Sequence, residues 1–133
     1  MRTEQLILRN LIHNEDYLRK VLPFLKNDYF SDTTERLIFD EITKFTENYN
    51  VPPTLTALQI SINEKKGLTS EEISESQDYI QKHLKDYETS NDDWLINKTE
   101  KFCQEKAIYN AVLESIHILD DKNKTLEKGA IPK

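Results

Sequence analysis

An uninterrupted stretch from Asp93 to Leu119 constrains the fold of this sequence most, because it contains neither Gly nor Pro. At about 100° per residue, a helix over this stretch gathers its large apolar side chains on one face. These side chains are Leu95, Phe102, Tyr109, Val112, Leu113 and Ile116. Such a helix is roughly 40 Å long, which is more than a small domain can cover by itself. We therefore predict that the six residues form a subunit interface, with an ordinary C-terminal core helix as the alternative.

The remaining sequence predicts a compact domain of several helices, and hence an all-α fold with the long helix at its end. The 133 residues are 37% hydrophobic and 32% charged and include only 2 Gly and 4 Pro, as expected for a helical protein with a charged surface. We divide the chain into a globular part over residues 1–90, the long interface helix over 91–120 and a polar linker over 121–133.

Capping signals define the helices of the globular part. Thr3, Asn14 and Thr54 each precede apolar residues at helical spacing and are predicted N-caps. Two segments, 32–35 and 69–72, have the form of a capping box, with Asp32 and Thr69 as caps and Glu35 and Glu72 reaching back. Pro23 and the Pro52-Pro53 pair mark breaks, and Gly67 stands where a left-handed C-terminal cap is expected.

The charge of the chain argues against direct binding to nucleic acid. The formal net charge is −6 and the isoelectric point is about 5.1. An acidic surface gains nothing from releasing the counterions of a phosphate backbone. We expect little binding of this chain to single-stranded DNA at about 0.15 M salt, near physiological ionic strength.

No catalytic or cofactor motif is recognisable in the sequence. Two glycines cannot supply a P-loop or a dinucleotide fingerprint, and His13, His83 and His117 lie on different predicted helices without ligands at metal spacing. Cys103 is the single cysteine and is predicted to be a partly buried, unreactive thiol. We therefore expect a non-catalytic chain with no cofactor and no metal; a small helical enzyme built from scattered carboxylates is an alternative that metal-dependent stabilisation would support.

The N-terminal segment lacks the features of a signal peptide, since its apolar run is short and no small-residue cleavage site follows. No window approaches the roughly 18 apolar residues of a membrane span. A single cysteine also suits a reducing compartment. These observations lead us to expect a cytoplasmic protein.

The order of several short motifs resembles the N-terminal domain of DnaB-type replicative DNA helicases, and most closely those of T-even phages. The motifs run along nearly the whole chain. They are Leu11-Ile12, Tyr17, Lys20-Val21, Pro23, Tyr29-Phe30, Val51-Pro52, Ala57-Leu58, Trp94-Leu95, Thr99-Glu100-Lys101, Ala107, Asn110-Ala111 and Gly129-Ala130-Ile131-Pro132.

This resemblance implies an all-helical domain that ends in a helical hairpin, through which neighbouring subunits pair into a collar on a hexameric ring. It implies contact with the primase, and with a helicase loader as a further partner. A downstream RecA-like motor domain would bind ATP and Mg²⁺ and drive 5′ to 3′ unwinding. One departure concerns the hairpin, because 120–128 is polar and the second helix would start only near Ala130. A free-standing helical adaptor is the alternative function.

Overall fold

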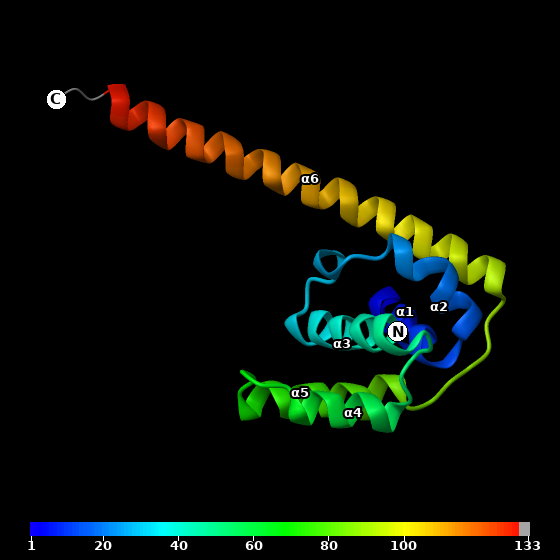
Figure 1. Ribbon diagram of the computed structural model, residues 1–133. Helices are drawn as coiled ribbons and strands as arrows, with labels where there is room; N and C mark the ends of the chain where they lie inside the picture. Colours follow the sequence, from blue (N-terminus) through cyan, green and yellow to red (C-terminus); the bar gives the residue numbers. More distant parts are fainter. Residues whose placement is uncertain (131–133) are drawn as a thin grey trace.

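The computed structural model describes the chain as far as Ala130, and its side chains as far as Lys122. All regular structure in this part is helical, which confirms the all-α prediction (Figure 1). The α-helices are α1 (Thr3–His13), α2 (Glu15–Val21), α3 (Thr33–Tyr49), α4 (Leu55–Glu64), α5 (Ser70–Tyr79) and α6 (Asp92–Ala130). Two 3-10 turns and one π-helical turn complete the elements: η1 (Leu22–Phe24), η2 (Asn27–Tyr29) and η3 (Ile80–Leu84).

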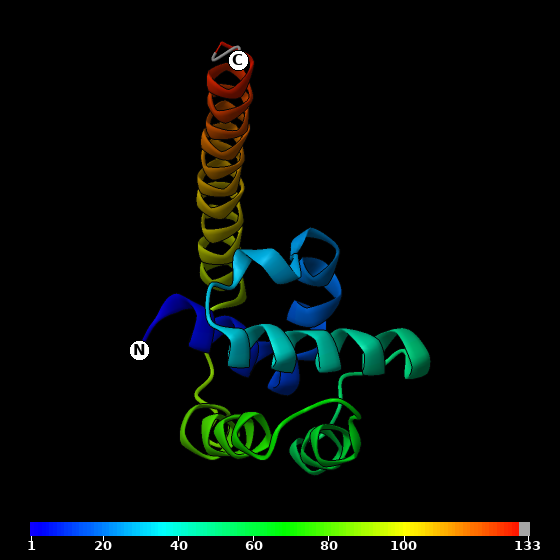
Figure 2. The same ribbon diagram turned by 90° about the vertical axis from the view of Figure 1, so that its left-hand side faces the viewer.

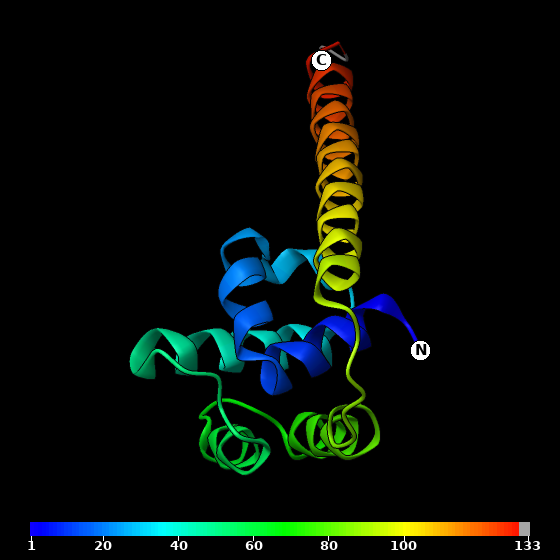
Figure 3. The same cartoon turned by 90° about the vertical axis from the view of Figure 1, so that its right-hand side faces the viewer.

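The first five α-helices form the globular part, and α6 extends away from it. α1 packs against α2 and α3, and α4 and α5 form a layer along one side of α1 and α3, where α3 contacts both of them and α1 contacts η3 (Figure 1). The views from either side show α6 standing out from this globular part along most of its length (Figures 2 and 3). Among the described residues, it touches the rest of the chain along its first half, as far as Asn110, mainly through α2, η2 and α1.

A single apolar core joins all of these helices. Its largest fully buried side chains come from four α-helices, the η2–α3 connection and the π-helical turn. They are Tyr17, Phe30, Ile7, Leu8, Leu11, Leu18, Ile38, Ile42, Leu58, Ile62, Ile80 and Leu84. Buried Leu95, Phe102 and Cys103 bring the start of α6 into the same core.

Side-chain caps begin several helices where the sequence predicts them. The Asn14 side chain accepts a hydrogen bond from the amide of Tyr17, and Thr54 accepts one from Ala57. Thr69 and Glu72 form the complete capping box that was expected at α5. Each cap supplies a partner for an amide that the helix leaves free, which fixes where the helix starts.

Three local predictions were wrong. Thr3 is the first residue of α1 rather than its cap, because Arg2, whose backbone is extended, occupies the N-cap position. Asp32 caps α3 by accepting from the amide of Thr34, but Glu35 turns inward instead of completing the box. Gly67 has a positive φ of 89°, yet α4 has already ended at Glu64, so this glycine serves the following turn.

Glu35 lies in the core because it has partners from two distant parts of the chain. Its Oε2 atom accepts hydrogen bonds from the Arg2 guanidinium and from the Tyr79 hydroxyl, each at 2.6 Å. Burial raises the pKa of the Glu35 carboxyl, although both hydrogen bonds favour its charged form. The side chain thereby ties α3 to α5 and to the start of the chain.

The long helix is longer than the sequence suggests. It spans 39 residues and includes most of the segment predicted to be a linker. That segment is polar, but it contains no Pro and no Gly before Gly129, so nothing in its composition stops a helix. The second hairpin helix was expected to start near Ala130. Residues 131–133, which would follow in that helix, lie outside the described part of the chain.

Candidate functional site on the long helix

The first part of α6 is anchored in the globular part by both apolar and polar contacts. Leu95 and Phe102 are almost fully buried, and the Phe102 ring lies 5.8 Å from that of Phe30. Between them, the Thr99 hydroxyl donates to the Leu95 carbonyl and shares a 2.6 Å hydrogen bond with the Tyr17 hydroxyl. Burial raises the pKa of Tyr17, which therefore stays neutral in this contact. The anchor fixes both the position and the rotation of α6.

Two exposed hydrogen bonds mark the limits of the anchored part. At its beginning, the Asn14 side-chain amide donates to the Asp92 carboxylate at 3.0 Å. Further along, the Asn110 side-chain amide donates to the backbone carbonyl of Asp28, also at 3.0 Å. From Ala111 to Lys122 every residue is exposed. This second part of α6 has no cover from the described part of its own chain.

The structure separates the six predicted interface residues into two groups. Leu95 is fully buried and Phe102 is 6% exposed, so both belong to the core of this chain and are unavailable to a partner. The other four are exposed over 38–58% of their surface: Tyr109, Val112, Leu113 and Ile116. This one face of the helix therefore packs against its own domain before Lys106 and is exposed to solvent after it. The interface prediction remains untested for the four exposed residues.

Two further apolar residues extend this exposed face. Ile108 and Leu119 are 66% and 59% exposed, and helical spacing places them beside Val112. We call the six exposed residues together the α6 stripe: Ile108, Tyr109, Val112, Leu113, Ile116 and Leu119. A helical projection that included every apolar residue of this sequence stretch would have identified both Ile108 and Leu119. Ile118 is equally exposed but lies on the other side of the helix.

A charged residue stands at the boundary between the buried and exposed parts. The Lys106 ammonium lies 5.8 Å from the ring centres of both Phe102 and Tyr109, within the range of a cation–π contact. Nearby Cys103 is buried, and burial together with the charge of Glu100 raises the pKa of its thiol. A neutral, covered thiol is a poor nucleophile.

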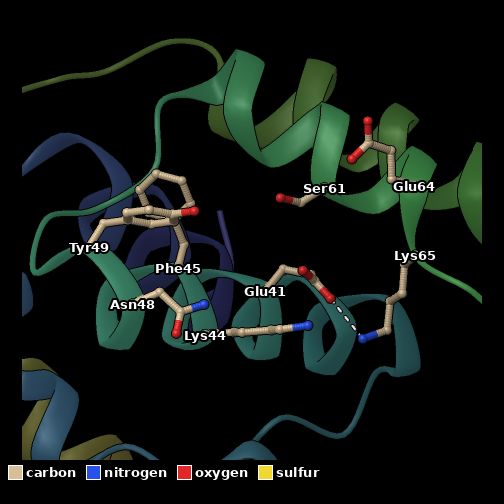
Figure 4. Close-up of a pocket in the computed structure, with 8 residues that line it drawn as sticks. All are labelled: Glu41, Lys44, Phe45, Asn48, Tyr49, Ser61, Glu64 and Lys65. Carbon is tan, nitrogen blue, oxygen red and sulfur yellow. Dashed lines mark hydrogen bonds and ion pairs between the residues drawn. The ribbon is translucent and has the colours of Figure 1, made fainter.

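A cleft of about 290 Å³ lies between α3 and α4 (Figure 4). At one end, the Lys65 ammonium donates to the Glu41 carboxylate at 2.7 Å. At the other end, the rings of Phe45 and Tyr49 pack 4.7 Å apart. The cleft is lined by Glu41, Lys44, Phe45, Asn48, Tyr49, Ser61, Glu64 and Lys65. Its lining includes no His or Cys. Its most buried carboxylate, that of Glu41, is already paired with Lys65.

Neither a metal site nor a membrane span is found in the part of the chain that the structure describes. No three His, Cys, Asp or Glu residues there come together in an arrangement that could hold an ion. No helix there combines the length and hydropathy that crossing a bilayer requires. The α6 stripe is thus the feature of this structure that most needs a functional explanation.

The sequence matches a known family. Residues 1–93 match the DnaB-like helicase N-terminal domain, so the chain belongs to this family of replicative helicase domains. The chain is also 29% identical over 136 residues to a DnaB-like replicative helicase of Enterobacteria phage T4. That alignment covers 96% of this chain but 28% of the phage T4 protein, so the chain spans just over a quarter of its relative's length.

Proposed function

We propose that this chain is a non-catalytic assembly domain, which holds together the subunits of a replicative DNA helicase through the α6 stripe. The observation that carries the proposal is a run of six large apolar side chains, all 38–66% exposed, on a helix that extends beyond its own domain. Contiguous apolar surface of this kind is rare on monomeric proteins and is typical of interaction sites. Membership of the DnaB-like family supports a role in helicase assembly.

The stripe suits pairing between two copies of the same helix. Apolar residues at Ile108, Val112, Ile116 and Leu119 recur at spacings of three and four residues, which is the pattern of helix-to-helix packing. Each protomer would contribute the same face, so a two-fold contact would bury two stripes at once. The start of α6 would meanwhile stay in its own core, where Leu95 and Phe102 hold it.

The complete protein would carry the chemistry that this chain lacks. By its likeness to a replicative helicase, a motor domain elsewhere in the protein would bind ATP and Mg²⁺ and unwind DNA in the 5′ to 3′ direction. The assembly domains would form dimers within a hexameric collar and would offer surfaces to the primase and to a helicase loader. We also propose that the protein acts in the cytoplasm, which is that of the host cell if the protein is encoded by a phage.

Sedimentation velocity over a range of concentrations tests the assembly role directly. The chain should shift from monomer to dimer as its concentration rises. The Leu113→Asp variant should associate more weakly than the wild type over the same range and keep its helical circular-dichroism spectrum. A wild-type chain that stays monomeric at every concentration would rule out the proposed role of the stripe.

A further inference from the structure

We propose a second self-association surface, in which Phe24 of one copy inserts into an apolar groove between α2 and α3 of another. The groove has a volume of about 490 Å³. Its floor is formed by Leu18 and Leu25, which are 1% and 6% exposed, and threonines of α3 form one wall. This surface lies on the globular part and shares no residue with the α6 stripe, so the proposal does not depend on the proposed function.

Phe24 is the group that such a groove can bind. Its side chain is 64% exposed although it belongs to the short 3-10 turn η1, and it does not line the groove beside it. Burying an aromatic side chain is among the largest gains that a protein contact can make. Phe24 is thus an exposed aromatic side chain whose two sequence neighbours line an apolar groove.

The position of Phe24 in the sequence favours a second copy of this chain as the occupant. Its two neighbours, Pro23 and Leu25, both line the groove, so Phe24 directly adjoins groove residues on both sides in the sequence. A two-fold axis passing between them would place each ring in the groove of the other copy. Two-fold contacts require this kind of self-complementary surface.

The charged residues at the edge of the groove match the same arrangement. Arg19 lines it from α2 and Glu47 from α3, so each copy presents one positive and one negative side chain. The Arg19 guanidinium already donates to Glu15 and to the Asn50 carbonyl, but its five N–H groups leave donors for a further acceptor. A two-fold contact can set Arg19 of each copy opposite Glu47 of the other.

A photo-reactive amino acid at position 24 tests this contact while keeping an aromatic ring there. The Phe24→p-benzoylphenylalanine variant is mixed with ¹⁵N-labelled wild-type chain and irradiated, and cross-linked peptides are identified by mass spectrometry. We expect cross-links from position 24 to labelled peptides containing 18–25 or 43–47. Isotope labelling separates these from links within one chain. The same photo-reactive residue at Ile60, which is 49% exposed on α4, provides the control.

Two results would overturn the proposal. One is the absence of labelled cross-links above the Ile60 control at a high protein concentration. The other is cross-linking that persists unchanged when the labelled chain carries Thr46→Trp, which fills the groove from its wall. Repeating the experiment with Leu113→Asp in both chains distinguishes the two surfaces. We expect the position-24 cross-links to survive there, even though contact through the α6 stripe is lost.

Discussion

Replacing Ile116 by aspartate should weaken self-association while leaving the fold of the chain intact. Ile116 belongs to the α6 stripe and is 49% exposed, and it lies beyond the last contact of α6 with the globular part. A surface substitution of this kind changes the free energy of unfolding by about 0.5 kcal/mol or less. The monomer should therefore melt at nearly the wild-type temperature.

The effect on association follows from the surface that Ile116 still exposes. Full burial of an isoleucine side chain is worth about 1.5–3 kcal/mol, so covering the exposed half contributes about 0.8–1.5 kcal/mol. In a two-fold dimer the loss occurs twice, at about 1.5–3 kcal/mol in total, which raises the dissociation constant roughly 10- to 150-fold. Desolvation of the new carboxylate would add to this loss.

Ile118→Asp is a matched control for this experiment. Ile118 is the same residue type on the same helix and is 53% exposed, but it lies about 200° away around the helix. Analytical ultracentrifugation should show a marked rise in the dissociation constant for Ile116→Asp and a small one for Ile118→Asp. Equal effects of the two substitutions would refute the assignment of a single interaction face, and no effect of either would refute the stripe altogether.

Three further predictions concern the fold. Phe102→Ala should lower the free energy of unfolding in urea by about 3–5 kcal/mol, because the ring is 6% exposed in the core; a loss below about 1 kcal/mol would place it at the surface instead. Asn14→Ala should cost about 1 kcal/mol by the same measurement, since the amide of Tyr17 loses its cap, whereas Asn14→Ser, which keeps a capping oxygen without setting a second carboxylate against Asp92, should retain most of it. Burial raises the pKa of Glu35 above its ordinary value of 4.5. The neutral carboxyl is therefore favoured in the folded state, and the stability that it supplies is complete below pH 4.5. This stability is lost as the pH rises through the pKa of the folded state. The unfolding free energy of wild type minus that of Glu35→Gln should therefore fall above pH 4.5, and a rise would mean that the Arg2 ion pair outweighs burial.

Local signals in the sequence were sufficient to place most helix boundaries. Asn14, Thr54 and Thr69 each accept a hydrogen bond from the amide three residues away, so their role depends on short-range geometry that the sequence already contains. Glu35 shows the limit of this reasoning. Its spacing from Asp32 fits a local cap, but Arg2 and Tyr79 come from distant parts of the chain whose approach the sequence does not reveal.

The candidate interface could be predicted only in part for a similar reason. Helical periodicity identifies the apolar face of α6, and Leu95 and Val112 belong to it equally well by that criterion. Periodicity does not say which part of the face its own domain covers. That depends on where α2 and η2 meet α6, which only the folded chain shows. The groove beside Phe24 was likewise unpredictable, because it forms between two helices that are separate in the sequence.

The hydrogen bond between Asn110 and Asp28 has a mechanical consequence. About 20 residues of α6 follow Asn110, and at 1.5 Å per residue they form an arm of roughly 30 Å. A tilt of about 10° at the base of an arm with this length would displace its tip by roughly 5 Å, close to one turn of helix. Small changes at Asn110 can therefore displace the far end of the α6 stripe without altering any residue of the stripe itself.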